Sequence, residues 1–199
     1  MSAAPAPPIV LASTSRQRRA ILTQLGLPFE VVPPRYEEHD PPDADPVELV
    51  RGHAQGKARS VVGGDGVDDR PVLGVDTTVV CAGRVYGKAG SAEEAAEMLD
   101  ALGGSTHEVV SGVCLLTRGW EVVEHEVTRV MFRPLTARDI AAYVAAGEWR
   151  DRAGAYAIQG LGAALVERIE GDYLNVVGLP AALLVRLLAE RFAGAYGFG

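Results

Sequence analysis

Residues 8–26 read PIVLASTSRQRRAILTQLG, and this stretch decides how the rest of the chain is interpreted. Residues 8–12 are mostly apolar, so we expect a short buried strand there. Residues 13–15 all carry hydroxyl groups and suit a turn, and the apolar spacing in residues 16–25 then predicts a helix that ends at Gly26. A strand that passes through a short turn into a helix indicates a fold that combines both elements.

Strands and helices are interleaved along the remaining sequence without a strict alternation. The expected helices are 46–62, 91–102, 136–147 and 180 onward, and the expected strands are 29–32, 72–80, 84–86, 107–116, 121–132, 155–159, 163–169 and 173–177. Hairpin turns at Ala82-Gly83 and Arg118-Gly119 argue against a purely parallel sheet. We therefore expect an α/β fold with a mixed, twisted sheet and flanking helices, formed by one domain over residues 1–199 with residues 1–8 as a flexible tail.

Local signals mark the ends of several elements. Ser91 and Glu94 have the spacing of a capping box, in which the Ser accepts from the first turn of the helix and the Glu bonds back to the N-cap amide. Thr136 is expected to cap the next helix. Residues 36–45 are acidic and Pro-rich, and residues 63–69 are rich in Gly and Asp, so both segments are predicted loops.

The composition excludes several classes of protein. Hydrophobic residues make up 48% of the 199 residues and charged residues 23%, which is typical of a globular protein and not of a disordered one. The apolar runs are far shorter than the roughly 20 residues of a membrane span, and the start of the chain lacks the pattern of a signal peptide. We therefore expect a cytoplasmic protein without a membrane partner. Cys81 and Cys114 lie in apolar runs and are expected to be core thiols.

The charge balance argues against a nucleic-acid polymer as partner, because the net charge is −7 and the pI about 5.1. An acidic protein that handles an anionic ligand must gather its cations locally or use a metal ion. The turn at residues 13–15 leads into a helix N-terminus, and Ser13, Ser15 and Arg18 there form a candidate phosphate site. The alternative is an ordinary N-cap with solvated arginines.

Other candidate residues are a carboxylate and two lysines. Asp76 lies at the end of an apolar strand segment, where it suits Mg²⁺ binding or proton transfer from water; a strand-end or turn residue is the alternative. Lys57 on a predicted helix and Lys88 in a loop suit charge neutralisation on a phosphoryl group, although single lysines are usually only solvated.

Gln159 is the polar side chain in the small-residue segment AGAYAIQGLG at residues 153–162. Small neighbours allow a flat ligand to approach, and an amide suits the edge of a base; the alternative is a Gly-punctuated strand with a bulge. The four histidines lack the spacing of metal ligands, and we interpret all of them as structural: His39, His53, His107 and His125.

Taken in order along the chain, these segments resemble the Maf family of nucleotide pyrophosphatases. The resemblance extends from about Ile9 to Leu188 and rests on LASTSRQRRAIL, YEEHDPP, GKA at Lys57, GVDTTVV, YGKA at Lys88, GGSTHEVVSGV and GAYAIQGLGAALVERIEGDYLNVVGLP. It implies a sheet in two lobes around a central cleft, as in Maf and inosine-triphosphatase folds. It also allows a homodimer. The Leu-rich last helix is one candidate interface, although packing in the core explains its leucines equally well.

The resemblance implies hydrolysis of the α–β phosphoanhydride of a nucleoside triphosphate with Mg²⁺ or Mn²⁺. Asp76 corresponds to the active-site acid of the family, and Glu38 to an acidic position that shares the metal. The remaining matches are Lys57 and Lys88 at basic positions, Ser13 and Arg18 at the phosphate, and Arg18, Thr77 and Gln159 where the family separates its substrate classes.

Gln159 favours dTTP and UTP, because a neutral amide matches the donor and acceptors of uracil and thymine. The related subfamily that acts on 7-methyl-GTP has an acid at this position. The sequence departs from the frequent S-P-R-R pattern, since Gln17 stands where an Arg is common, and Ala89 replaces a frequent Pro. Alternative functions are a nucleotide-binding regulator of cell division without catalysis and a pyrophosphatase for 7-methyl-GTP, inosine or xanthosine triphosphate.

Overall fold

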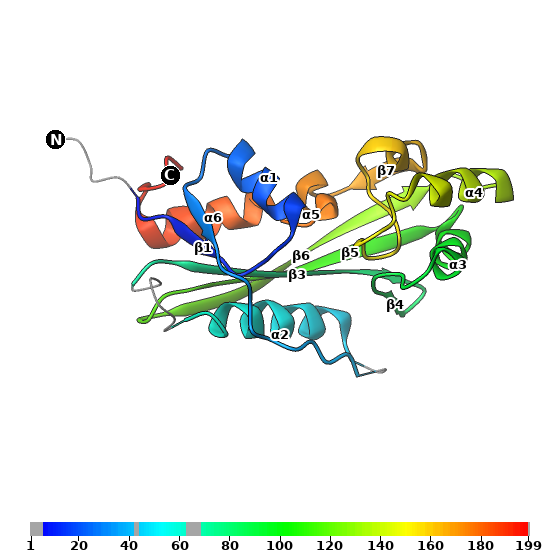
Figure 1. Ribbon diagram of the computed structural model, residues 1–199. Coiled ribbons are helices and arrows are strands. Elements are labelled where there is room, and N and C mark those ends of the chain that lie inside the picture. The colour runs from blue at the N-terminus through cyan, green and yellow to red at the C-terminus, as the bar shows by residue number, and fades with distance from the viewer. Residues whose placement is uncertain (1–5, 42–43, 63–68, 199) are drawn as a thin grey trace. The chain divides into compact units, whose positions relative to one another are not determined.

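The computed structural model describes residues 6–41, 44–62 and 69–198 (Figure 1). Its elements in chain order are β1 (Ile9–Leu11), α1 (Arg16–Gln24), β2 (Phe29–Val31), α2 (Pro46–Arg59), β3 (Val72–Cys81), β4 (Arg84–Tyr86), α3 (Ala92–Leu102), β5 (Thr106–Leu116), β6 (Glu121–Phe132), α4 (Ala137–Ala146), the 3-10 helix η1 (Gly160–Ala164), β7 (Val166–Glu170), α5 (Tyr173–Val177) and α6 (Ala181–Phe192). The predicted tail at residues 1–5 and most of the predicted loop at 63–69 lie outside the described ranges.

The strands form one mixed sheet in the order β2-β1-β3-β5-β6-β7, with β4 beside β3. β1 pairs in parallel with both β2 and β3, whereas β4 is antiparallel to β3 and β7 is antiparallel to β6. This confirms the predicted mixed α/β fold. Leu11 lies opposite Leu73, and the amide of Ala12 donates to the carbonyl oxygen of Leu73 at 2.9 Å. The turn after β1 therefore begins beside the part of β3 that leads to Asp76.

The chain divides into two compact units, and β3, β5 and β6 contribute residues to each. Unit 1 contains Met1–Asp76, Ser111–Glu126 and Gly178–Gly199, and unit 2 contains Thr77–Val110 and Val127–Val177. The candidate residues from Ser13 to Asp76 thus fall in unit 1, and Thr77, Lys88 and Gln159 fall in unit 2.

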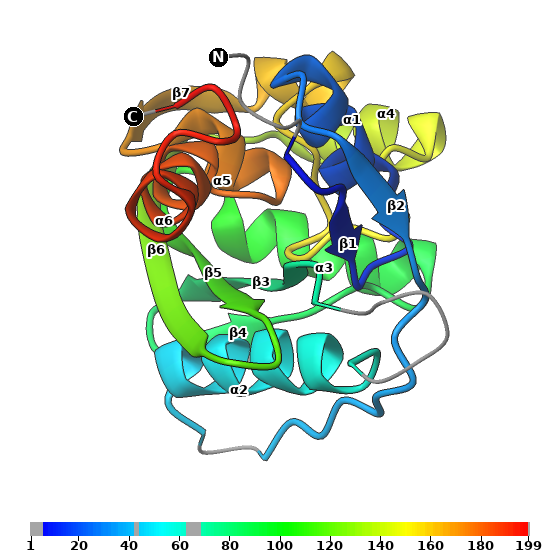
Figure 2. The same cartoon turned by 90° about the vertical axis from the view of Figure 1, so that its left-hand side faces the viewer.

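In unit 1, α2 lies directly against the backbone of β3 and β5. A Cβ at Gly74 would overlap the carbonyl oxygen of Ala54, and a Cβ at Gly112 would overlap that of Val50. The helix can approach this closely only because both strand positions are glycines. Figure 2 shows α6 on the opposite side of these strands from α2. Side chains from both sides are buried in this unit, among them Val10, Ala58, Val72, Cys114, Leu184 and Leu188.

In unit 2, α3, α4 and β7 surround a second apolar core. Phe132, which is fully buried, has edge-on ring contacts with His107 and Tyr156 at centroid distances of 4.9 and 4.8 Å. The Nε2 of His107 lies 2.9 Å from the hydroxyl of Tyr156. Cys81 belongs to this core, and both cysteines are buried free thiols, as predicted.

Two predicted strands near the C-terminus are wrong. Residues 155–159 form turns and bends, because Gly154 and Ala155 take positive φ angles of 66° and 55° that a strand does not contain. Residues 173–177 form α5, at whose start the Asp172 carboxylate accepts from the amide of Leu174 at 2.7 Å. The predicted strand at 163–169 is right only from Val166, because η1 occupies its beginning.

The predicted helix ends are partly corrected as well. Ser91 caps α3 by accepting from the amide of Glu94, but the Glu94 carboxylate accepts from Gly90 and not from Ser91. Thr136 and Asp139 form a complete capping box at α4.

Pro7, in the predicted tail, accepts a 2.7 Å hydrogen bond from the hydroxyl of Tyr196. In the described ranges, no helix has the length and apolar character that crossing a membrane requires.

Candidate functional site

The turn between β1 and α1 is organised around the hydroxyl of Ser13, which is 5% exposed. Its Oγ accepts from the amide of Ser15 at 3.2 Å and from Nη1 of Arg18 at 3.1 Å. Ser15 is the N-cap of α1, and its Oγ accepts from the Arg18 amide at 3.4 Å. The guanidinium of Arg18 also donates from Nε to the carbonyl oxygen of Gly178 at 3.0 Å. The three predicted phosphate residues therefore lie in one hydrogen-bonded group at a helix N-terminus.

Two carboxylates stabilise the positive charge of Arg18. Burial lowers the pKa of Arg18, and the negative charges of Asp76 and Glu38 counteract that shift. An arginine keeps its proton despite such a shift, so its charge is permanent. Both carboxylates therefore stabilise the charged guanidinium, although one is on β3 and the other in the segment at 36–41.

Lys57 links the same two carboxylates. Its Nζ lies 2.5 Å from Asp76 Oδ1 and 2.5 Å from Glu38 Oε1. The Lys57 side chain is 10% exposed and that of Asp76 14%, whereas that of Glu38 is 49% exposed. Ion pairs of largely buried groups are weakly screened by solvent, so removing one partner leaves an uncompensated charge.

The position of Lys57 follows from the packing of α2. Lys57 is in the last helical turn, three residues after Ala54, which lies against Gly74 of β3. Asp76 is two residues beyond Gly74 on the same strand, so the close approach of helix and strand brings the two charged groups together. Asp45 caps the other end of α2 by accepting from two amides at 3.0 Å each.

His53 of α2 holds the loop that carries Glu38 through two hydrogen bonds. His53 is 4% exposed, and its Nδ1 lies 3.0 Å from the hydroxyl of Tyr36 while its Nε2 lies 2.7 Å from Asp40 Oδ1. The Tyr36 ring covers Gly56, where a Cβ would overlap it. Burial raises the pKa of Tyr36, and the charge of Glu38 adds to the rise. The loop is thus bonded to α2 two residues before and two residues after Glu38.

The sequence interpretation missed Tyr36 and Asp40 and assigned His53 only a structural role. One signal was present, since His53 and Lys57 are four residues apart and share a face of a predicted helix. The symmetric placement of Tyr36 and Asp40 around Glu38 has meaning only once the loop is seen beside α2.

Thr77, Lys88 and Gln159 are residues of unit 2. Thr77 is half-buried and directly follows Asp76 on β3. Lys88 is exposed and forms an isolated antiparallel bridge with Ala153. Gln159 is exposed at the N-cap of η1. The structure therefore brings six of the nine predicted residues together in unit 1: Ser13, Ser15, Arg18, Glu38, Lys57 and Asp76.

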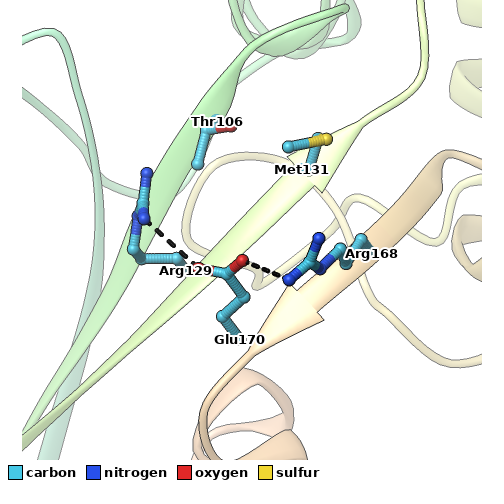
Figure 3. A pocket seen from close by; sticks show the side chains of 5 residues that line it. All are labelled: Thr106, Arg129, Met131, Arg168 and Glu170. Carbon is cyan, nitrogen blue, oxygen red and sulfur yellow. Dashed lines mark hydrogen bonds and ion pairs between the residues drawn. The ribbon is translucent and has the colours of Figure 1, made fainter.

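A pocket of unit 2 has a different character (Figure 3). Thr106 and Met131 line it beside Arg129 and Arg168, whose guanidinium groups both pair with Glu170, at 3.2 and 2.6 Å. All three charged side chains are more than 40% exposed. Exposed pairs of this kind are strongly solvated, and this pocket does not contain any of the predicted site residues.

The carboxylate pair of unit 1 suits a divalent cation. Glu38 and Asp76 already place oxygens around a single positive charge, the Lys57 ammonium. Among the residues that the structure describes, no group of three or more His, Cys, Asp or Glu side chains suits a metal ion. Mg²⁺ is commonly held by one or two carboxylates together with water and substrate phosphates, and Mn²⁺ accepts the same ligands. The site therefore fits a cation that binds together with a phosphate ligand.

Comparison with known proteins gives one consistent result. Residues 8–191 match the model of a family described as Maf-like protein. A dTTP/UTP pyrophosphatase of Moorella thermoacetica is 51% identical over 91% of this chain and 93% of its own length. The protein of the same name in Gloeobacter violaceus is 49% identical over 92% and 95%, and that in Deinococcus radiodurans is 43% identical over 100% of both chains. The chain therefore belongs to the Maf-like protein family.

Proposed function

We propose that this protein hydrolyses dTTP and UTP to the nucleoside monophosphate and pyrophosphate. The observation that carries the proposal is the cluster in unit 1, where Lys57 bridges Glu38 and Asp76 beside Arg18. The names of the relatives support the same reaction, because those relatives match over nearly the whole chain.

The turn after β1 supplies the groups that hold the triphosphate. Ser13 and Ser15 present hydroxyls at the N-terminus of α1, and Arg18 presents a permanent positive charge. Helix N-terminal amides and a guanidinium are the groups that recognise phosphate oxygens in proteins. Because Arg18 is already bonded to Ser13 and Gly178, little ordering of its side chain is required when the ligand binds.

Asp76 is the proposed general base. One Asp76 oxygen takes a proton from water as the water oxygen forms a bond to the α-phosphorus, and the bond from that phosphorus to the α–β bridging oxygen breaks. Pyrophosphate leaves with the bridging oxygen. Lys57 orients Asp76, and its positive charge stabilises the negative charge that develops on the pyrophosphate leaving group. A divalent cation held by Glu38 and Asp76 would supply further positive charge to the phosphate oxygens.

The residues of unit 2 provide the proposed selectivity. Gln159 offers both a donor and an acceptor, which match the imide edge of thymine and uracil, and Thr77 is a further substrate contact. Lys88 has a different proposed role, which is to neutralise negative charge on the pyrophosphate leaving group. A mismatched base would leave a buried polar group unpaired, at a cost of about 1–3 kcal/mol.

The test is product analysis with isotopically labelled water. The purified protein is incubated in H₂¹⁸O with Mg²⁺ or Mn²⁺ and one of dTTP, UTP, 7-methyl-GTP, ITP or XTP, and the products are separated by chromatography. The proposal predicts dTMP or UMP that carries the ¹⁸O, together with unlabelled pyrophosphate. If the ¹⁸O were found in the pyrophosphate instead, water would have attacked the β-phosphorus.

Other outcomes would contradict the proposal in distinct ways. Intact nucleotide with measurable binding would indicate a regulator without catalysis. Release of orthophosphate would indicate a different phosphohydrolase. Turnover of ITP and XTP in preference to dTTP would replace the pyrimidine assignment by a purine one.

A further inference from the structure

We propose that Glu148 is a positioning residue that sets base selectivity by capping η1 in place of Gln159. The inference rests on the proposed function, since it assumes that the Gln159 amide contacts the base. It concerns how the fold of unit 2 keeps that amide available for a ligand.

The carboxylate of Glu148 bonds to the amides directly after Gln159. Its Oε1 accepts from Leu161 at 3.1 Å and its Oε2 accepts from Gly162 at 3.2 Å. Between these contacts the carboxylate passes close to Gly160, where a Cβ would lie 2.5 Å from Oε1. Gly160 has a φ of 66°, so both space and backbone conformation require glycine there.

These two amides are the ones that an N-cap side chain normally satisfies. Gln159 is the N-cap of η1, so Leu161 and Gly162 occupy the second and third helical positions. The side chain of Gln159 makes no capping hydrogen bond. Glu148 satisfies both donors from outside the helix. The side-chain amide of Gln159 is therefore not needed to cap η1, and it remains exposed for a ligand.

Tyr143 holds the same turn on the side that precedes Gln159. Its hydroxyl accepts from the amide of Ala157 at 2.9 Å. The turn is closed so tightly that a Cβ at Gly162 would overlap the carbonyl oxygen of Ala157. The backbone is thus held two residues before and two residues after Gln159, by groups from α4 and the turn that follows it.

Glu148 is itself held by the end of α4. Gly147 ends the helix with a left-handed φ of 74°, which turns the chain toward η1. The next residue after Glu148, Trp149, is 6% exposed in the core, and its Nε1 donates to the carbonyl oxygen of Val144 at 3.0 Å. With its neighbours on both sides fixed, the carboxylate has a defined position.

The experiment compares Glu148→Ala and Glu148→Gln with the wild-type protein. In Glu148→Ala the two amides lose their acceptor, and the Gln159 side chain is expected to turn back and cap them. The ratio of kcat/KM for dTTP to that for ITP should fall roughly tenfold, equivalent to about 1.4 kcal/mol. The loss should lie mainly in KM for dTTP, because the groups of unit 1 that act on phosphate are unchanged. Glu148→Gln keeps one acceptor oxygen and should give an intermediate ratio.

Glu94→Ala is the matched control. Glu94 is a carboxylate of unit 2 that accepts from the amide of Gly90 at 2.7 Å, so its loss should lower stability without changing the ratio. Hydrogen exchange provides a readout independent of turnover. The amides of Leu161 and Gly162 should exchange faster in Glu148→Ala, where one amide oxygen of Gln159 replaces two carboxylate oxygens, and should keep their protection in Glu94→Ala.

The outcomes separate this inference from the proposed function. Wild-type selectivity or unchanged amide protection in Glu148→Ala would overturn the positioning role, even if Gln159→Glu alters the selectivity. If Gln159→Glu leaves the ratio unchanged, base recognition by Gln159 fails and the role of Glu148 fails with it, whereas hydrolysis of dTTP would still stand.

Discussion

The ammonium of Lys57 lies 2.5 Å from the carboxylate of Asp76, and the same nitrogen is paired with Glu38. A lysine in the last turn of α2 thus balances two carboxylates, one from β3 and one from the segment at 36–41. In the proposed reaction this ion pair fixes the position of the Asp76 carboxylate before a substrate binds.

Lys57→Met is expected to reduce turnover of dTTP at least 100-fold and to lower the melting temperature, because two carboxylates would face each other without the ammonium. Added millimolar Mg²⁺ should raise the melting temperature of this variant more than that of the wild type, since a cation can replace the lost charge. Calorimetry with and without Mg²⁺ measures this difference. The absence of a shift in the Lys57→Met variant would show that the carboxylate pair does not bind the cation.

His53→Phe should loosen the loop that carries Glu38 while preserving the bulk of the side chain on α2. Two hydrogen bonds disappear, to Tyr36 and Asp40, so we expect a loss of about 1–3 kcal/mol in unfolding free energy. The Mg²⁺ concentration for half-maximal activity should rise as well. Tyr36→Phe removes one of the two bonds and should give a smaller effect on both quantities. Full activity at the wild-type Mg²⁺ requirement would limit His53 to a structural role.

Gly74→Ala tests whether the contact between α2 and β3 positions Lys57. The added Cβ would overlap the backbone of Ala54, so we expect a loss of roughly 3 kcal/mol in stability and a drop in kcat. Gly52→Ala is the matched control on the same helix, because a Cβ there meets no atom within 4 Å and alanine favours a helix by up to about 1 kcal/mol. Denaturant titrations of both variants give the comparison. Equal stabilities would show that the close approach is not needed.

The stability of the protein should fall as the pH decreases from about 6.5 toward 4. Burial lowers the pKa of His107 from 6.5 to about 4, so the folded protein keeps this side chain neutral while the unfolded chain takes up a proton. The unfolded state binds more protons across this range, and the total loss is on the order of 3 kcal/mol. Unfolding titrations of the wild type and of His107→Gln should differ in slope over this window. Parallel curves would contradict the burial-driven shift.

The sequence predicted most of the fold because most elements have clear local patterns. The apolar run that became β1, the glycine ends of α1 and α4, and the hairpins around β4 and β6 all follow from periodicity and turn residues. The errors lie where local preference and tertiary context compete. Apolar and aromatic residues in 155–159 and 173–177 favour strands, but positive φ angles at Gly154 and Ala155 and the Asp172 cap produce turns and a helix instead.

The candidate site could be predicted only as a set of residue types. Asp76 and Lys57 could be proposed from burial and charge, and the structure adds that they are direct partners. Glu148 could not be identified in advance, because it reaches η1 across 13 residues of chain and sequence patterns describe only neighbours along one element. The same reason hides the bond between Arg18 and Gly178, which are 160 positions apart.

Asp76→Asn removes the proposed base while preserving the size of the side chain. With dTTP and Mg²⁺ under saturating conditions, we predict that kcat falls by about 10²–10⁴-fold while the far-ultraviolet circular dichroism spectrum stays that of the folded protein. Wild-type turnover by a folded Asp76→Asn variant would contradict it.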